Sequence, residues 1–268
     1  MLPANLPLPV VAAIPELRQA LAAGTAAVLQ APPGAGKTTV VPVALLEEPW
    51  LAGRRLVMLE PRRLAARAAA ARLARNLGEP LGETVGYHIR FERVAGRRTR
   101  ILVVTEGILT RMLQRDPSLD GIGLLIFDEF HERSLHADLG LALALDAQRG
   151  LRNDLRVLVM SATLDGARVA RMLDDAPVVR AEGRLFPVET RHLERESRDP
   201  AERQVARAVC AALEASPGDV LAFLPGRGEI HRTAGLLAAA GLPATADVRP
   251  LYSNLPPADQ DAAIEPRS

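Results

Sequence analysis

The sequence has 268 residues, of which 48% are hydrophobic and 24% charged, and its formal net charge of +1 excludes a strongly basic surface as its main means of binding nucleic acid. Aromatic residues make up only 3% and Cys210 is the one cysteine, which argues against base-stacking platforms, a disulfide framework and a cysteine zinc site. We see no signal peptide and no apolar run that could span a membrane, so we expect a cytoplasmic protein without a membrane partner.

The first distinctive stretch lies between a predicted strand at residues 25–30 and a predicted helix that begins near residue 40. It is rich in small residues and contains Gly-Lys-Thr; its members are Ala31, Pro32, Pro33, Gly34, Ala35, Gly36, Lys37, Thr38 and Thr39. A small-residue loop between a strand and a helix lets backbone N–H groups surround phosphate oxygens. The stretch therefore predicts a phosphate-binding loop.

Within this loop we expect Lys37 to reach the β- and γ-phosphates and the Thr38 hydroxyl to coordinate Mg²⁺. The strict pattern has glycine where this sequence has Ala31, so the loop alone is an incomplete match. Lys37 is the only lysine, and the other 32 basic residues are arginine. A compact ammonium fits a phosphate cradle better than a planar guanidinium, which favours a phosphate site over a chance helix cap.

Apolar runs of strand length then alternate with helical sequence. They lie at residues 54–59, 101–104, 124–127 and 157–160. None alternates apolar with polar residues, so we predict an α/β fold with a parallel sheet covered by helices on both faces. Each run ends in a polar cluster, and in such sheets ligands bind beyond the carboxyl ends of the strands.

The cluster after residue 127 begins with Asp128 and Glu129. In phosphate-loop ATPases one carboxylate here holds Mg²⁺ and a neighbour orients or deprotonates the attacking water, roles that we assign to Asp128 and Glu129 respectively. The alternative is a solvated acidic turn. His131 and His136 are five residues apart, which on a helix rotates them by roughly 140°, so we reject a helical zinc motif. His131 is either a coupling residue near the γ-phosphate or a local hydrogen-bonding residue.

Two further clusters open predicted helices and suit the phosphates of a nucleic-acid strand, although exposed arginines are often only solvated: Arg62 with Arg63, and Thr105 with Glu106 and Gly107. A third cluster supplies hydroxyl groups at a strand end or caps the next helix, and it consists of Ser161, Ala162 and Thr163.

The character of the sequence changes after residue 175, where proline, glycine and charged residues accumulate. We expect a first domain at residues 1–180, a linker at 181–198 and a second domain at 199–268. In the second part we predict helices at about 200–215 and from about 225, with strands at 219–224 and 248–255. Two strands are few for a domain of this kind, which suggests that it is truncated.

Taken together, the motifs resemble those of DEAH/RHA-type superfamily 2 helicases over essentially the whole chain. The matching stretches occur in the family's order at residues 31–39, 61–66, 105–111, 128–134 and 161–165, and residues 85–92 look like another family segment. Phe130 stands where the family has alanine. The resemblance implies two RecA-like domains with ATP and Mg²⁺ between them. It also implies 3′-to-5′ movement along single-stranded RNA or DNA; we expect RNA, although the sequence alone does not decide between the two.

The resemblance also assigns roles. It gives Lys37, Thr38, Asp128 and Glu129 the functions proposed above, and it assigns the coupling of hydrolysis to strand movement to His131, Ser161, Ala162 and Thr163. The resemblance also implies that Arg72 stacks on the adenine of ATP. Residues 223–227 and 251–253 begin the helicase C-terminal part. The implied nucleic-acid contacts are Arg62, Arg63, Thr105, Glu106, Gly107 and Arg227.

The family's arginine-finger motif does not occur before Ser268, so we expect an N-terminal fragment that binds ATP and Mg²⁺ but hydrolyses ATP slowly and does not unwind. One alternative is a catalytically silent nucleotide- and RNA-binding module. Another is a phosphate-loop kinase or transporter ATPase, which leaves residues 105–107 and 161–163 unexplained. The sequence does not indicate an oligomeric state.

Overall fold

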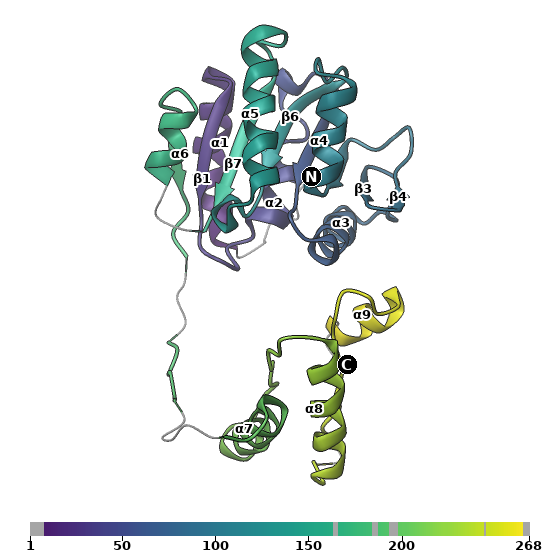
Figure 1. The fold of residues 1–268 in the computed structure, drawn as a ribbon. Helices are drawn as coiled ribbons and strands as arrows, with labels where there is room; N and C mark the ends of the chain where they lie inside the picture. Colours follow the sequence, from purple (N-terminus) through teal and green to yellow (C-terminus); the bar gives the residue numbers. More distant parts are fainter. Residues whose placement is uncertain (1–7, 163–165, 184–186, 193–197, 244, 265–268) are drawn as a thin grey trace. The chain divides into compact units, whose positions relative to one another are not determined.

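The computed structural model divides into two compact units, Met1–Phe186 and Pro187–Ser268 (Figure 1). It describes residues 8–162, 166–183, 187–192, 198–243 and 245–264. Each unit has its own helices. Among the described residues, no helix combines the length and the apolar character that crossing a membrane requires.

The first unit is built on one sheet, whose described strands run in the order β4-β3-β5-β2-β6-β7-β1-β8. Every neighbouring pair is parallel except β3 and β4, which form an antiparallel hairpin. The predicted parallel sheet is therefore confirmed. The strands are β1 (Ala26–Gln30), β2 (Arg55–Leu59), β3 (Val85–Ile89), β4 (Glu92–Val94), β5 (Ile101–Val104), β6 (Ile122–Phe127), β7 (Arg156–Ser161) and β8 (Val178–Arg180).

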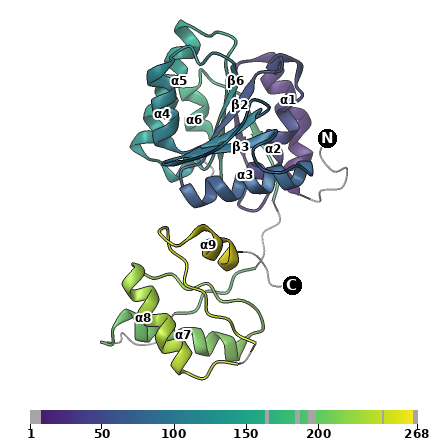
Figure 2. The ribbon, with the colours of Figure 1, turned by 90° about the vertical axis from the view of Figure 1, so that its right-hand side faces the viewer.

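Helices cover both faces of this sheet (Figure 2). One face carries α1 (Ile14–Ala23), α2 (Lys37–Leu45) and α3 (Arg63–Leu77), and the other carries α4 (Glu106–Arg115), α5 (Leu135–Gly150) and α6 (Gly166–Met172). The connections include short 3-10 helices, namely η1 (Pro9–Ala13), η2 (Pro49–Leu51) and η3 (Phe130–Glu132).

The apolar runs reflect this two-sided burial. Because side chains alternate along a strand, Leu56 and Met58 of β2 join the core on the α1–α3 side, whereas Val57 and Leu59 join the core on the α4–α6 side. Both sets need apolar residues, so the strand reads as an unbroken hydrophobic run. The sequence did not predict β3, β4 and β8. β8 extends the sheet beside β1, within residues 176–198 that the sequence assigns to the crossing into the second unit.

The described part of the second unit contains α7 (Ala201–Ala215), α8 (Arg227–Ala239) and α9 (Pro257–Ile264), and no strand. A small core of Ala206, Val209 and Leu237 joins α7 to α8. The predictions of strands at residues 219–224 and 248–255 are wrong for this structure. An extended segment becomes a strand only when another backbone pairs with it, and neither segment has such a partner among the described residues.

Replacing either of two glycines of the first unit by alanine is expected to change the stability in opposite directions. A Cβ atom at Gly140 in α5 would lie 3.5 Å from Leu109 Cδ2, an ordinary contact, whereas one at Gly86 in β3 would lie 2.4 Å from the Val94 carbonyl oxygen. We expect Gly140→Ala to raise the free energy of unfolding by about 0.5–1 kcal/mol and Gly86→Ala to lower it. Urea unfolding followed by the fluorescence of Trp50, the only tryptophan, checks both. Equal responses would contradict this account of the packing.

Candidate functional site

The carboxyl ends of five parallel strands lie along one edge of the sheet. Backbone hydrogen bonds align the loops that follow these strands with one another. The Ala31 N–H donates to the Ser161 carbonyl at 3.0 Å, and the Asp128 N–H donates to the Leu59 carbonyl at 3.0 Å. Glu60 directly follows Leu59, so Glu60 and Asp128 extend from neighbouring strands, and the polar clusters predicted at the strand ends form one continuous edge.

The predicted phosphate loop joins β1 to α2 and has the backbone conformation that its glycines permit. Gly34 and Gly36 have φ angles of 76° and 91°, in the left-handed region that favours glycine. A Cβ atom at Gly36 would also lie 2.9 Å from Leu8 Cδ1. Ala31 is buried and its φ is not positive, so alanine replaces the glycine of the strict pattern without strain.

The charged residues of this loop pair with the cluster after β6. Lys37, only 4% exposed, places its Nζ 2.7 Å from Glu129 Oε1. The Thr38 hydroxyl donates to Asp128 Oδ2 at 2.5 Å, and the Glu129 N–H donates to Asp128 Oδ1 at 2.8 Å. Two motifs that are 90 residues apart in sequence are thus in direct contact.

Burial governs the electrostatics of Asp128. Its loss of hydration raises the pKa to about 6, and the neighbouring charge of Glu129 acts in the same direction. The hydrogen bond from Thr38 and the charge of Lys37 oppose this rise in the pKa. Asp128 therefore remains largely ionised at neutral pH. Because its Oδ2 lies next to the Thr38 hydroxyl, a cation bound by Thr38 could also bind Asp128.

The two oxygens of Thr38 and Asp128 are hard donors of the kind that Mg²⁺ prefers. No group of three or more His, Cys, Asp or Glu side chains in the part of the chain that the structure describes could hold a metal ion alone. A magnesium ion here would therefore draw its remaining ligands from phosphate oxygens and water, as is usual for Mg²⁺ at nucleotide sites.

His131 connects this cluster to the end of β7. Its Nδ1 lies 3.3 Å from Glu129 Oε2 and accepts a hydrogen bond of 3.3 Å from the Ala162 N–H. One nitrogen cannot donate to Glu129 and accept from Ala162 at the same time, so the tautomer of the ring, with or without a hydrogen on Nδ1, decides which partner this nitrogen binds. Ser161 is buried beside this contact, and Thr163 lies outside the described residues.

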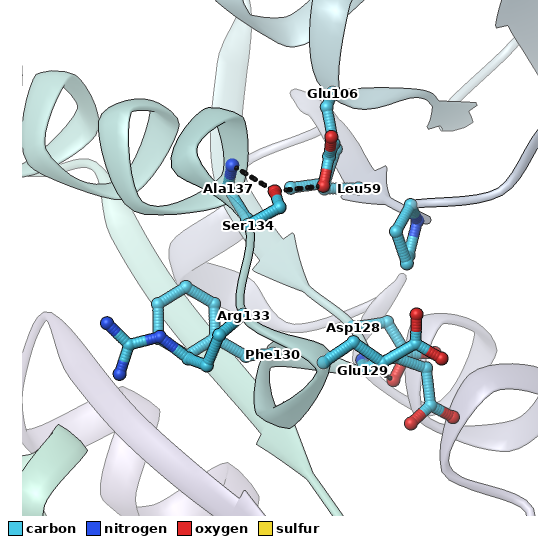
Figure 3. A pocket seen from close by; sticks show the side chains of 10 residues that line it. Leu59, Glu106, Asp128, Glu129, Phe130, Arg133, Ser134 and Ala137 are labelled. Atoms are coloured by element: carbon cyan, nitrogen blue, oxygen red, sulfur yellow. Dashed lines mark hydrogen bonds between the residues drawn. The ribbon is translucent and has the colours of Figure 1, made fainter.

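The residues that the sequence assigned to nucleic acid lie at the same edge. Arg62 and Arg63 begin α3, and the Arg62 guanidinium contacts Glu132 Oε1 at 2.9 Å. Thr105 precedes α4, Glu106 begins it, and a Cβ atom at Gly107 would meet nothing within 4 Å, so this helix terminus is open to an approaching backbone. Glu106 and the cluster after β6 line one small cavity (Figure 3).

The other two assigned residues lie elsewhere. Arg72 is exposed on α3, on the same side of the helix as Asn76, which donates to the Thr39 carbonyl at 3.0 Å. Arg227 begins α8 in the second unit, with its guanidinium over the Tyr252 ring at 5.3 Å from the centroid.

Sequence reasoning missed Glu60. This residue follows β2 and is 5% exposed, and its Oε2 has no hydrogen-bond partner among the described residues. Burial raises its pKa to about 8, with further contributions from Asp128, Glu129 and Glu132, while Lys37 acts in the opposite direction. The available signal was its position, because Glu60 is the first residue after its strand, as Asp128 is after β6.

Comparisons with known proteins agree with this geometry. A family model described as DEAD/DEAH box helicase matches residues 12–172. The ATP-dependent RNA helicase HrpB of Escherichia coli (strain K12) is 52% identical over 259 residues, which cover 97% of this chain and 32% of that protein. Crystal structures of the E. coli DEAH/RHA helicase HrpB and of the E. coli DExH-box NTPase HrpB match with TM-scores of 0.89 and 0.78 at 51% and 50% identity. The match to the first structure covers 97% of this chain and 33% of that chain, and the match to the second covers 99% and 32%. This chain therefore spans about a third of its relatives' length.

The pKa of Glu60 predicts a pH dependence of stability. The carboxyl group is protonated in the folded protein up to about pH 8 but ionised in the unfolded chain above its ordinary value of 4.5. Folding therefore binds a proton in this window, and the free energy of unfolding falls as the pH rises through it. Asp128 acts in the same direction only up to about pH 6.

We expect the wild type to lose about 1–2 kcal/mol of stability between pH 6.5 and 8, and Glu60→Gln to lose much less, because glutamine does not titrate. Urea unfolding followed by Trp50 fluorescence at each pH measures the difference. Glu16→Gln, on the exposed side of α1, is the matched control. An identical slope in wild type and Glu60→Gln would show that Glu60 is already ionised in the folded protein.

Proposed function

Because the chain belongs to the DEAD/DEAH box helicase family, we propose that it is the ATP-binding part of a nucleic-acid helicase motor. In this proposal the chain binds ATP with Mg²⁺ and one strand of nucleic acid. The strand is RNA rather than DNA, because the E. coli relative is named an RNA helicase. In a protein of the full length of these relatives, hydrolysis would drive 3′-to-5′ translocation. The two units correspond to RecA-like domains at residues 1–180 and 199–268, joined by a linker at 181–198, and the protein acts in the cytoplasm.

The observation that carries the proposal is the pairing of Lys37 with Glu129 and of Thr38 with Asp128. A buried ammonium needs an anionic partner, and in this structure the partner is a carboxylate. The phosphates of ATP offer Lys37 a better match inside a loop whose glycines already turn inward. Phosphate binding would then release Glu129 from Lys37.

The released Glu129 is the proposed general base. Its carboxylate would orient the attacking water and accept a proton from it, while Lys37 holds the β- and γ-phosphates. A bound Mg²⁺, held by Thr38 and Asp128, supplies charge neutralisation at the phosphates. His131 positions Glu129 from the other side and connects it to Ala162, so His131, Ser161, Ala162 and Thr163 remain the proposed coupling residues.

The proposed nucleic-acid path runs along the same edge of the first unit. Arg62 and Arg63 supply positive charge, and the open terminus of α4 at Thr105, Glu106 and Gly107 supplies backbone N–H groups to strand phosphates. Arg72 remains the proposed adenine contact, and Arg227 is the proposed strand contact of the second unit.

A nucleotide- and RNA-binding module without turnover is the second candidate. It is favoured by the direct contact between Lys37 and Glu129, which keeps the proposed base engaged in this structure. The two candidates share every binding property and differ in whether bound ATP is hydrolysed.

Lys37→Ala tests the phosphate loop. Removing the ammonium leaves the phosphate charge without its buried partner, so we expect the Kd for ATP with Mg²⁺ to rise at least about 100-fold. Isothermal titration measures it, with Arg149→Ala as a control because Arg149 forms an exposed ion pair with Asp174. Unchanged ATP affinity in Lys37→Ala would refute the assignment.

Glu129→Gln separates binding from chemistry. Glutamine cannot take the proton from water and no longer competes as an anion for Lys37, so we expect ATP to bind at least as tightly and single-turnover hydrolysis to fall about 10²- to 10⁴-fold. Hydrolysis that is unaffected by the substitution would remove Glu129 from the mechanism. Tight ATP binding by the wild type with no hydrolysis, even when single-stranded RNA is present, would favour the silent module.

A further inference from the structure

The segment at residues 129–134, which follows Asp128, is held from two sides. On one side Lys37 contacts Glu129, and the Ala162 N–H donates to His131. On the other side two residues from the proposed nucleic-acid path contact the segment: Arg62 reaches Glu132, and the Ser134 hydroxyl donates to Glu106. The segment thus contacts residues of both proposed ligand sites.

The backbone of this segment stores strain at both ends. Glu129 and Arg133 have φ angles of 48° and 43°, and neither is glycine. Such conformations typically cost non-glycine residues about 1 kcal/mol or more each, and they persist when neighbouring contacts hold them. A segment that its contacts keep in place is expected to respond when one of them is exchanged for a ligand.

The segment at residues 129–134 also has space in which to move. A cavity of about 70 Å³ lies against the segment and has room for a few water molecules (Figure 3). Its lining includes Glu106, Asp128, Glu129, Phe130 and Ser134. The cavity therefore connects the terminus of α4 with the proposed metal and water residues.

Of the two contacts on the nucleic-acid side, the one from Glu106 is the stronger. Arg62 is 72% exposed, and an exposed ion pair contributes little. Glu106 and Ser134 are partly buried, and the Ser134 hydroxyl donates to the Glu106 carboxylate. The same hydroxyl accepts the Ala137 N–H at 2.9 Å and so caps the 16-residue helix α5 (Figure 3).

We propose that Glu106 is a positioning residue that links strand binding at α4 to the ATP site through Ser134; this inference rests on the proposed function. A strand phosphate at the N–H groups of α4 would repel the Glu106 carboxylate, which changes its hold on Ser134. ATP would change the same segment from its other end by taking Lys37 from Glu129. Two ligands that bias one element are thermodynamically coupled, and each changes the affinity of the other by the same factor.

The experiment measures this factor in the 268-residue chain. The Kd of a non-hydrolysable ATP analogue with Mg²⁺ is determined with and without saturating oligouridine, and the ratio is the coupling factor. We expect a wild-type factor of about 5 or more, within the usual range for coupled sites. Ser134→Thr keeps both the donor and the cap, so we expect it to retain the factor.

Ser134→Asp isolates the bond to Glu106. Aspartate still caps α5, but it has no hydrogen to donate and it repels Glu106. We expect the factor to fall close to 1, while the ATP affinity without RNA stays close to that of the wild type. Glu106→Gln keeps an acceptor for the Ser134 hydroxyl but removes the charge that a strand phosphate repels, so it should also bring the factor close to 1; a purely structural role for Ser134 predicts an unchanged factor in this variant.

The outcomes separate the two proposals. A wild-type chain that binds neither the ATP analogue nor oligouridine would overturn the proposed function, and this inference with it. Binding of both ligands with no coupling, or full coupling in Ser134→Asp, would overturn the link through Glu106 and leave the proposed function standing. A coupling factor close to the wild-type value in Glu106→Gln would also count against that link.

Discussion

The structure of the first unit depends on one buried cation. Lys37 is the only lysine in the sequence, and its ammonium lies among carboxyl groups at the edge of the sheet. A charge removed from water is stable only with an anionic partner, so Lys37 requires the cluster after β6 to lie close to the loop after β1. The order of the strands provides this proximity, because β7 alone separates β1 from β6.

Burial and neighbouring charge act together on Glu60. Loss of hydration is the largest cause that raises its pKa, Asp128, Glu129 and Glu132 raise it further, and Lys37 acts in the opposite direction. Negative charge therefore exceeds positive charge around this carboxyl group, and such an excess is relieved by protonation or by cations. The backbone at Glu129 and Arg133 has positive φ angles that are unfavourable for residues other than glycine. Side-chain contacts of the loop hold it in this conformation.

In the second unit, the local sequence predicts the helices correctly but not the strands. The sequence predicts its helices α7 and α8, and the structure shows that they pack through a few apolar side chains. Its predicted strands did not form, and Leu221 and Phe223 remain 73% and 84% exposed. Helices make their hydrogen bonds within one segment, whereas a strand depends on a partner, so local sequence predicts the former better.

The sequence by itself determined the α/β class, the strands that end in the phosphate loop and in the acidic cluster, and most of the residues now grouped at the sheet edge. These follow from local patterns: apolar runs buried on both faces, small residues before Gly-Lys-Thr, and paired carboxylates after a strand. Only the tertiary structure decided that Lys37 pairs with Glu129, that Ser134 joins Glu106 to α5, and that Glu60 is buried beside Asp128. Each of these depends on which strands become neighbours, and therefore on contacts between residues far apart in the chain.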